Sequence, residues 1–503
     1  MMIFKPQKLH PISYFTGLID VIKQNIFVII VFIGFNIWNF DFTNIRHYIG
    51  PGIFLLIILF SMINQFQKVR LTRYWIENDQ FIVTSGWLNK KRKELNLNRI
   101  QSLDTTQGLI NQLVGGVRLQ IKTPSDGIEL ETISKQQSEL IERTIKKRQL
   151  QLDSQEIEPD NKPNNSEQEL ISEDSSNNEV IFKMSNKLLI FMALTSGVIG
   201  VAFATISPII GAFEDIIPWE KWTSRLFQWI QSVTFLVTMI ILIVLIFCYV
   251  IGTLIVVLRY YNYTITQHDN ELKITYGLLN VKNITVPTER LQAVVEKQSF
   301  IRKLFGYTSI YFIITSDLEV KSNEDVSENG KIMILPFINK KEAYSIIRKL
   351  IPEMQFNSIT ENVPKRGYHR HFFIPSIILI LGATIGAYYW SKWSYIIAII
   401  IIIFMAIHAY VYISVSGLCN RKNEIALRQV SMMHINSYYF KKDKIIGMNV
   451  NQNPLLEKSH LAHLHFIIAK GAVNEDIKLK YASEKQVQLN IETYLGGSKI
   501  ERT

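Results

Sequence analysis

Long apolar stretches occur in closely spaced pairs along the chain. A helix needs about 20 largely apolar residues to cross the ~30 Å hydrocarbon core of a bilayer, and six stretches meet that requirement. The chain between one pair and the next is long and polar. The six stretches are residues 20–39, 48–66, 187–210, 229–258, 372–390 and 394–415. We therefore expect three transmembrane hairpins.

Positive charge is distributed unequally around these stretches. Two crossings in each pair return the chain to its starting side, so both termini and all long polar regions share one compartment. That side carries many basic residues, including Lys68, Arg70 and Arg73, whereas Arg46 and Lys392 are among the few in the short hairpin loops. Basic loops stay in the cytoplasm. The pattern predicts a multi-pass cell-membrane protein with cytoplasmic termini, whose first apolar run is a retained anchor.

The polar regions after the first two hairpins repeat one another. Segments 86–115 and 277–306 each begin with Gly, have an Arg 13 residues later, and end with Gly after 16 more. Both arginines start the pattern Arg-[Ile or Leu]-Gln-x-[Leu or Val]. The third polar region fits more loosely, because Lys444 replaces the Arg and Ile446 and His460 replace the Gln and the second Gly. A matching offset and motif indicate an internal repeat.

Each repeat is predicted to be β-rich and to end in a helix. Short runs of β-branched and aromatic residues such as 81–83, 95–97, 117–121 and 310–313 indicate strands. A residue that can cap a helix is followed three positions later by Gln or Glu, as in a capping box. These pairs are Ser134 and Gln137, Asn339 and Glu342, and Ser483 and Gln486. A small β structure with an amphipathic closing helix has the outline of a pleckstrin-homology (PH)-like barrel.

The predicted fold is therefore membrane α-helical, with three two-helix hairpins, plus three cytoplasmic α+β PH-like domains. Each domain is expected to be a small β-barrel or sandwich closed by its C-terminal helix. The predicted hairpins are 15–68, 183–258 and 368–415, the PH-like domains are 69–150, 259–353 and 416–497, and an acidic linker spans 151–182. Within it, 153–179 has nine acidic residues and one Lys, a composition that favours disorder.

The repeated motif resembles the bacterial PH-domain type 2 family. Its residues are Gly86, Arg99, Gln101, Leu113 and Gly115 in the first repeat, and Gly277, Arg290, Gln292, Leu304 and Gly306 in the second. Three such domains behind helix pairs resemble the YdbT-type membrane proteins of Gram-positive bacteria, over about residues 15–495. The resemblance implies a PH-like fold and a cytoplasmic-membrane location, without an established enzyme activity or ligand. It also implies envelope functions such as resistance to antimicrobial peptides.

Composition and charge narrow the possible partners. Hydrophobic residues make up 48% and charged residues 19%, and two cysteines exclude a disulfide scaffold. The net charge is +11, with basic runs at 90–93, 146–148 and 441–444. Such runs are solvated faces or contacts to anionic lipid headgroups. Nucleic acid is the third alternative, but no helix-turn-helix, zinc module or stacking motif accompanies the basic runs. We therefore expect no nucleic-acid partner.

The motif pairs Arg99 with Gln101 and Arg290 with Gln292 are the candidate site residues. Positions i and i+2 of a strand share a face, so each pair could form a polar interaction surface. Each pair could equally hold its own domain together, and we favour this structural role.

Other chemistry is sparse. His460, His463 and His465 have metal-like spacing, but only Glu457 lies near enough in sequence to complete a site. A single histidine, His408, lies within an apolar stretch, which is a hint of function. No motif for catalysis or nucleotide binding is present. We expect no catalytic residue, metal or cofactor.

These observations favour a non-enzymatic membrane protein whose PH-like domains act at the inner leaflet. We expect them to bind membrane lipids, including anionic headgroups, or another membrane protein, and we identify no small-molecule substrate. The function would support envelope integrity or resistance to antimicrobial peptides. The alternative is a transporter or an accessory subunit of a membrane export complex.

Overall fold

A computed structural model of the chain provides the structure, which forms two compact units, residues 1–286 and 287–503. The predicted domain 259–353 is thereby divided between them. The structure describes residues 5–37, 46–87, 89–123, 127–157, 179–196, 234–268, 271–315, 327–328, 330–359, 361–389, 392–421, 423–431, 434–471 and 473–495.

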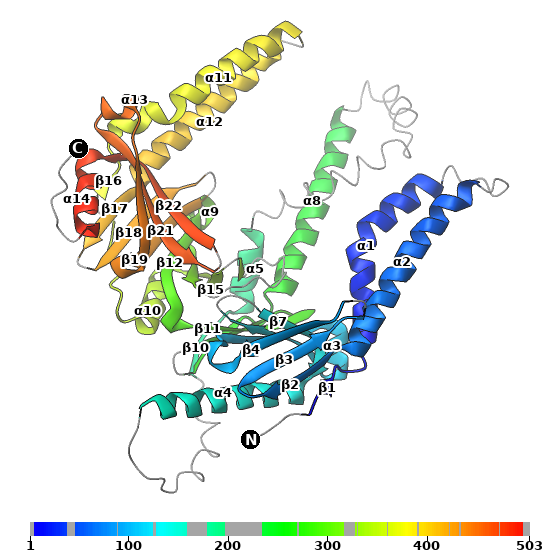
Figure 1. The fold of residues 1–503 in the computed structure, drawn as a ribbon. Helices are drawn as coiled ribbons and strands as arrows, with labels where there is room; N and C mark the ends of the chain where they lie inside the picture. Colours follow the sequence, from blue (N-terminus) through cyan, green and yellow to red (C-terminus); the bar gives the residue numbers. More distant parts are fainter. Residues whose placement is uncertain are drawn as a thin grey trace. The chain divides into compact units, whose positions relative to one another are not determined.

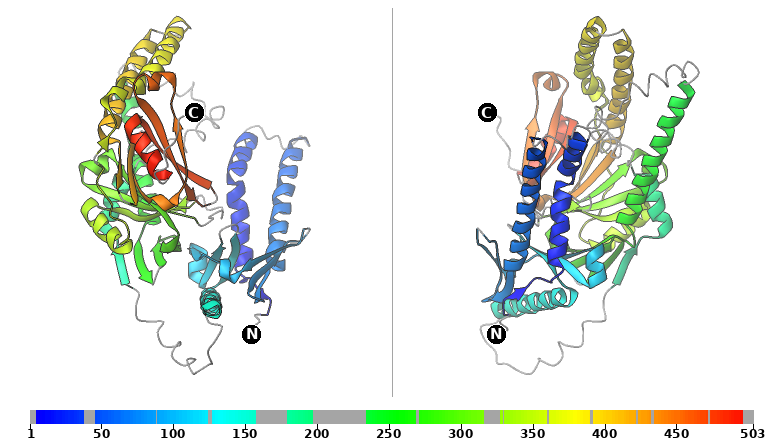
Figure 2. Two further views of the ribbon diagram at one scale, coloured as in Figure 1. Left: turned by 60° about the vertical axis from the view of Figure 1, so that its left-hand side comes forward. Right: turned by 90° about the vertical axis from the view of Figure 1, so that its right-hand side faces the viewer.

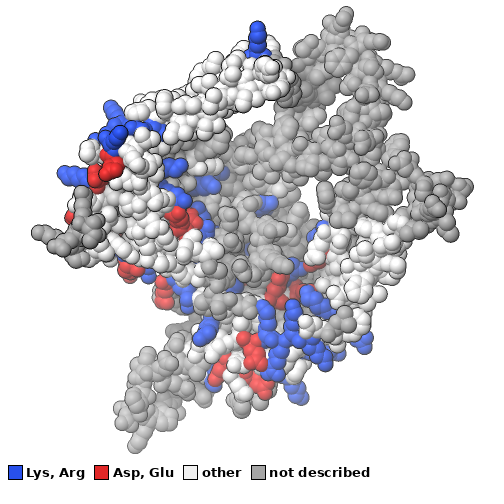
Figure 3. Space-filling model, turned by 45° about the horizontal axis from the view of Figure 1, so that its top comes forward, with Lys and Arg blue, Asp and Glu red and all other residues white. Residues whose placement is uncertain are grey.

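The apolar stretches form long helices. In the first unit α1 (Ser13–Ile37) and α2 (Arg46–Leu71) run side by side (Figures 1 and 2). In the second unit α11 (Tyr368–Tyr389) and α12 (Trp393–Val415) do the same. Among the described residues, Gly52–Leu71, Lys365–Tyr389 and Trp393–Val415 are long and apolar enough to span a membrane. The surface of the α11–α12 arm is almost free of charge (Figure 3).

The middle pair of apolar stretches is described only in part. Helix α5 (Asn186–Leu194) starts the predicted span 187–210, whose residues after Ser196 lie outside the described part. Helix α8 (Thr234–Arg259) covers most of the second stretch.

The first unit contains two antiparallel sheets. The smaller has the strand order β1 (Gln7–Lys8), β2 (Arg73–Glu77), β3 (Gln80–Ser85) and β4 (Lys91–Asn96). The larger has seven strands in the order β7 (Gly127–Ser134), β6 (Gly116–Lys122), β5 (Ser102–Gly108), β11 (Asn280–Pro287), β10 (Glu271–Tyr276), β9 (Thr264–His268) and β8 (Glu179–Lys183). Strands from two successive repeats therefore share one sheet.

The second unit follows the same plan. Its eight-stranded sheet has the order β14 (Ser327–Glu328), β15 (Lys331–Asn339), β13 (Tyr307–Ile314), β12 (Leu291–Ser299), β19 (His434–Lys441), β18 (Glu424–Val430), β17 (Gly417–Arg421) and β16 (Glu361–Asn362). Its three-stranded sheet has the order β20 (Ile445–Asn451), β21 (Leu461–Lys470) and β22 (Val473–Ser483).

Sheet sharing corrects the predicted closed barrels. Strand β5 completes its backbone hydrogen bonds with β11 of the next repeat, and β12 does so with β19. An open edge strand can be paired by any matching strand, so the sheets extend into the neighbouring repeat instead of closing on themselves. We call the β5–β11 and β12–β19 contacts the two junctions.

The order of elements recurs three times, including the loosely matching third region. Each time, a short strand is followed by apolar helices, three strands and a 3₁₀ helix, and then by one strand, a short helix, two or three further strands and a closing helix. The 3₁₀ helices are η1 (Leu97–Arg99), η3 (Thr288–Arg290) and η5 (Lys442–Lys444). Lys444 therefore holds the position that the sequence alignment assigned to it.

The closing helices are α4 (Lys135–Ile157), α10 (Lys340–Leu350) and α14 (Glu484–Tyr494). Capping boxes are confirmed at Ser134 and Ser483, where each serine hydroxyl accepts the backbone N–H of the Gln three residues later, and each Gln side chain accepts the serine N–H. At Asn339 the side chain caps Lys341 N–H instead, at 3.0 Å, so the predicted box with Glu342 is wrong.

Regular structure covers both ends of the predicted acidic linker 151–182. Helix α4 continues to Ile157, and β8 begins at Glu179, so both ends of the predicted segment 153–179 have regular structure. Residues 158–178 lie outside the described part of the chain.

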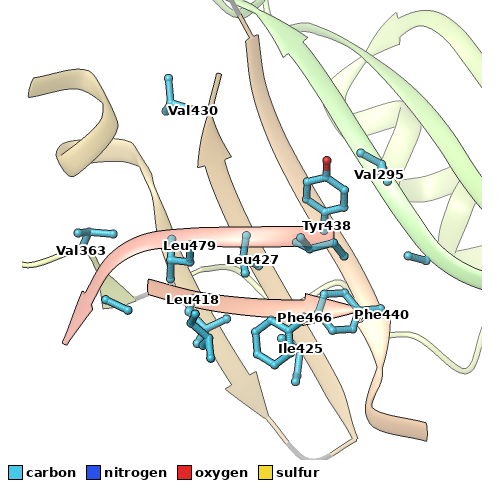
Figure 4. Packing of buried hydrophobic residues seen from close by; sticks show 14 of the residues in the cluster. Val295, Val363, Leu418, Ile425, Leu427, Val430, Tyr438, Phe440, Phe466 and Leu479 are labelled. Carbon is cyan, nitrogen blue, oxygen red and sulfur yellow. The ribbon is translucent and has the colours of Figure 1, made fainter. Parts of the chain in front are cut away.

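Side-chain contacts fix the helix pairs to the sheets. Arg118 in β6 pairs with Asp20 of α1 at 2.6 Å, and the Ser13 hydroxyl donates to the Thr132 carbonyl at 3.1 Å. In the second unit the Lys480 N–H donates to the Tyr412 hydroxyl of α12 at 2.9 Å. The core of that unit joins residues of several elements, including Val295, Tyr438, Phe440, Phe466 and Leu479 (Figure 4).

Candidate interaction surface

The first motif pair does not form a polar surface. Arg99 is the exposed last residue of η1, whereas Gln101 lies just before β5 and is only 7% exposed. The Gln101 N–H donates to the Lys122 carbonyl at 2.7 Å, and its two amide atoms have no hydrogen-bond partner within the described part of the chain. The two residues therefore do not lie in one strand, because Arg99 ends the 3₁₀ helix and Gln101 precedes β5.

The second motif pair makes a local contact. Arg290 ends η3 and is half-buried, and the Gln292 side chain donates to the Arg290 carbonyl at 3.1 Å. This bond links the 3₁₀ helix to the start of β12. The contact fits the structural role that we favoured, although the function of these residues stays a prediction.

The motif leucines are among the most exposed apolar side chains. Leu113 lies in the short helix α3 (Leu109–Val114) and is 87% exposed, and Leu304 lies in α9 (Phe300–Leu304) and is 83% exposed. Both helices end in a left-handed turn at Gly115 or Gly306, with φ of 66° and 72°. Glycine adopts such a φ without steric cost.

The exposed face of α3 continues onto the next repeat. The Gln112 side chain donates to the carbonyls of Leu278 and Leu279, in the β10–β11 turn, at 3.1 Å each. Both leucines are about 40% exposed, and Leu109 is 53% exposed. We call Leu109, Leu113, Leu278 and Leu279 the apolar tip. It spans the β5–β11 junction.

The apolar tip lies where a long apolar helix meets its sheet. The Leu278 N–H donates to the carbonyl of Leu258, in the last turn of α8, at 3.0 Å. The tip is therefore held at the sheet end of an apolar helix. Apolar side chains exposed there can enter the interfacial layer of a bilayer or contact another membrane protein.

Equivalent short helices in the second unit are also exposed. In α9, Ile301 is 58% and Phe305 beyond it 53% exposed, and in α13 (Pro454–Glu457) Leu455 is 48% exposed. Exposed Lys303 adds positive charge to α9.

The turn after α13 follows the geometry of the other two. His460 stands at the position of Gly115 and has φ of 48°, also left-handed. Arg366 donates to the His460 carbonyl at 3.2 Å, and Arg370 in the first turn of α11 donates to the Ser459 hydroxyl at 3.1 Å. The α13 turn thus also lies at the base of membrane-length helices.

The β5–β11 junction contains buried charge. Asp104 and Lys122 form an ion pair with side chains 6% and 5% exposed, and Asp104 also accepts the Thr285 N–H of β11 at 2.9 Å. Burial, aided by the charges of Arg259 and Lys122, lowers the pKa of Lys282 to about 8. Buried charges need partners, so this polar contact fixes which strands can pair.

The second junction has its own buried carboxylate. Glu296 is 2% exposed, pairs with Lys340 at 2.8 Å and accepts a hydrogen bond from the Tyr344 hydroxyl at 2.8 Å. The Tyr344 and Tyr439 hydroxyls are also 2.8 Å apart. The closing helix α10 therefore contacts β19 of the next repeat as well as its own.

The basic runs differ in their contacts. Lys91, Arg92 and Lys93 lie exposed along β4. Lys146 pairs with Glu271 at 3.1 Å, and Arg148 pairs with Asp79 at 2.5 Å. The run in α4 thus joins elements of the first unit, whereas the run in β4 stays exposed although Arg92 pairs with Glu94 at 2.6 Å and Lys93 donates to the Gly127 carbonyl at 3.3 Å.

The remaining candidates do not form a metal site. His460 contacts Glu484, His465 contacts Asp476, and His463 accepts the Tyr481 N–H, so the three rings have separate partners. Across the described residues no group of three potential ligands is close enough to hold a metal ion. Burial lowers the pKa of His463.

The single histidine of the apolar stretches has a histidine neighbour. The rings of His408 and His371 lie 5.5 Å apart, between α12 and α11. The two histidines therefore lie within the α11–α12 arm.

Sequence reasoning missed the apolar tip. The signal was present, because Leu109 and Leu113 are four residues apart and flank the polar Gln112, but we assigned no role to the motif leucine. The partner leucines come from a segment about 165 residues later in the chain, and only the sheet pairing brings them together.

Comparisons with known proteins agree with the resemblance. The family model of the bacterial PH domain matches residues 26–149 and 198–354, more than half of the chain. A transmembrane protein of Bacillus subtilis (strain 168), named YdbT, is 29% identical over 413 residues, which are 80% of this chain and 80% of that protein. No solved structure matches the chain.

Proposed function

Because the chain belongs to the bacterial PH domain family and is a membrane protein, we propose that it holds its repeats against the inner leaflet and binds lipid there. In this proposal it is a non-enzymatic, multi-pass protein of the cytoplasmic membrane with both termini in the cytoplasm. Its three repeats are PH-like domains, each following a transmembrane hairpin.

The observation that carries the proposal is the position of the apolar tip. Leu113 is 87% exposed and belongs to a cluster bonded to the last turn of α8. Exposing an apolar side chain to water is unfavourable by about 25 cal/mol per Å², and the interfacial layer of a bilayer would remove that cost. The basic charge beside α9 would favour anionic headgroups, at roughly 1 kcal/mol per Lys or Arg near the surface.

Depth-dependent quenching tests the lipid contact directly. The full-length Leu113→Cys variant would carry a nitrobenzoxadiazole label in vesicles of phosphatidylcholine and phosphatidylglycerol that contain a doxyl-labelled lipid. Leu140→Cys is the matched control, because Leu140 is 49% exposed on the closing helix α4 and does not belong to the apolar tip. Native Cys248 and Cys419 are both buried.

We expect quenching of the label at residue 113 to exceed that at residue 140 several-fold, and to grow with the phosphatidylglycerol fraction. Equal, weak quenching at both positions would refute the lipid contact. Strong quenching at residue 113 without dependence on phosphatidylglycerol would keep the apolar insertion but remove the preference for anionic lipid.

We propose that the cellular outcome is envelope integrity or resistance to antimicrobial peptides, an extension that rests on the family resemblance. A strain without the protein should survive exposure to a membrane-active peptide less well. Wild-type protein should restore survival, and a Leu113→Glu variant present at the same level in the membrane should not. Unchanged survival of the deletion strain would refute this role while leaving the lipid contact untouched.

A further inference from the structure

The two junctions join their repeats in the same register. In the first, Thr105 lies opposite Asn283, and in the second, Glu296 lies opposite Ser437. Thr105 and Glu296 each come six residues after the basic residue that ends the 3₁₀ helix of their own repeat. Asn283 and Ser437 each come seven residues before the corresponding basic residue of the next repeat. One pairing rule therefore describes both junctions.

Two strands that hold junction positions in their repeats, β4 and β20, lie at sheet edges in the described part of the chain. Within the described residues, β4 is paired on one side, with β3, and β20 is paired on one side, with β21. Strand β4 corresponds to β11 and β19, which accept a preceding repeat. Strand β20 corresponds to β5 and β12, which bind a following repeat. The chain therefore leaves one strand of each kind, β4 and β20, without a strand of another repeat beside it.

Equivalent residues of β5, β12 and β20 differ in their burial. Asp104 in β5 is 4% exposed and Val295 in β12 is fully buried. Both lie five residues after their motif basic residue. Asn449 is the equivalent residue of β20, and it is exposed. Strand β20 thus corresponds to a junction strand that lacks its neighbouring strand, which leaves Asn449 exposed.

The same comparison holds for β4. Ile284 in β11 is 7% exposed and Tyr438 in β19 is 5% exposed, whereas Lys93 at the equivalent position of β4 is exposed. A Lys opposite an Asn is compatible with pairing, because the first junction already contains the partly buried Lys282 near Asp104. The charges of β4 also discourage pairing with unrelated edges.

We propose that copies of this chain associate head to tail, β20 of one copy pairing antiparallel with β4 of the next. The shared register places Val450 opposite Arg92 and Asn449 opposite Lys93. A contact between two different surfaces of identical chains produces a closed ring or an open row. The occupant is a second copy because each chain carries both complementary edges, and anchoring in one membrane keeps them at high local concentration.

Disulfide cross-linking between two tagged full-length chains tests the register. One chain carries Lys93→Cys, and the other, with a different tag, carries Asn449→Cys. Directly opposed residues of an antiparallel pair have Cα atoms about 4.5–5.5 Å apart, which lies within the Cα range of disulfides. The matched control replaces Lys93→Cys with Arg92→Cys, whose side chain lies on the other face of the strand. Each variant expressed alone gives the background from Cys248 and Cys419.

We expect mild oxidation of native membranes to give a dimer carrying both tags, at least tenfold more abundant for residue 93 than for residue 92. Native mass analysis in gentle detergent should show more than one copy of the wild type. The proposal fails if residues 92 and 93 cross-link equally, or if no mixed dimer forms although both variants reach the membrane. It also fails if Lys93→Cys cross-links only to a different membrane protein.

Discussion

The buried ion pair of Asp104 in β5 with Lys122 in β6 should stabilise the strand that forms the β5–β11 junction. Both side chains are almost fully buried, at 6% and 5% exposed. Removing one member of such a pair leaves the other charge without a partner, which costs about 3–5 kcal/mol, whereas replacing both by apolar groups is often neutral. Asp104→Asn is the sharper single change, because its amide oxygen can still accept the Thr285 N–H that Asp104 accepts at 2.9 Å.

We expect Asp104→Asn and Lys122→Met each to lower the free energy of unfolding of the first unit by about 3 kcal/mol. The double variant should lose clearly less than the sum, with a coupling of about 2 kcal/mol. Pulse proteolysis in mild detergent across a urea series measures the fraction folded. If the two single losses add in the double variant, the charges do not interact, and the reasoning about this ion pair is wrong.

Three other contacts give separate tests. Glu424→Ala should raise amide hydrogen exchange in 355–357 at least tenfold relative to wild type, because this carboxylate accepts all three backbone N–H groups of that segment at 2.7–3.2 Å. Between pH 8 and 9.5 the unfolded chain keeps the Lys282 proton, whereas the folded chain, in which the pKa of Lys282 is lowered, releases it. The free energy of unfolding should therefore rise with pH, and Lys282→Met should reduce this slope. Tyr344→Phe removes the hydroxyl bonded to Glu296 and should lower the free energy of unfolding of the second unit by about 1–2 kcal/mol, which a lower thermal midpoint would show.

Local features of the fold could be predicted from the sequence because they depend on neighbouring residues. The repeated motif glycines Gly86 and Gly277 have φ of 102° and 105°, and a Cβ at either would lie 2.1 Å from a backbone carbonyl oxygen, so the repeat marks a turn that needs glycine. The capping boxes at Ser134 and Ser483 need only the residue three positions later. Side-chain alternation did not reveal that Arg99 ends a 3₁₀ helix, so Arg99 and Gln101 do not lie in one strand.

Sheet sharing could not be predicted, for a physical reason that follows from the repeat itself. Strands β5, β12 and β20 occupy equivalent places, and so do β4, β11 and β19, so pairing within a repeat and between repeats leaves the same alternation in the sequence. The choice is made by contacts between distant residues, such as Asn283 donating to the Thr105 hydroxyl at 3.0 Å. A junction built from equivalent strands has no intrinsic stopping point. A chain of such repeats therefore has one free strand edge at each end of the series, and that edge either stays exposed, is covered, or pairs with another chain.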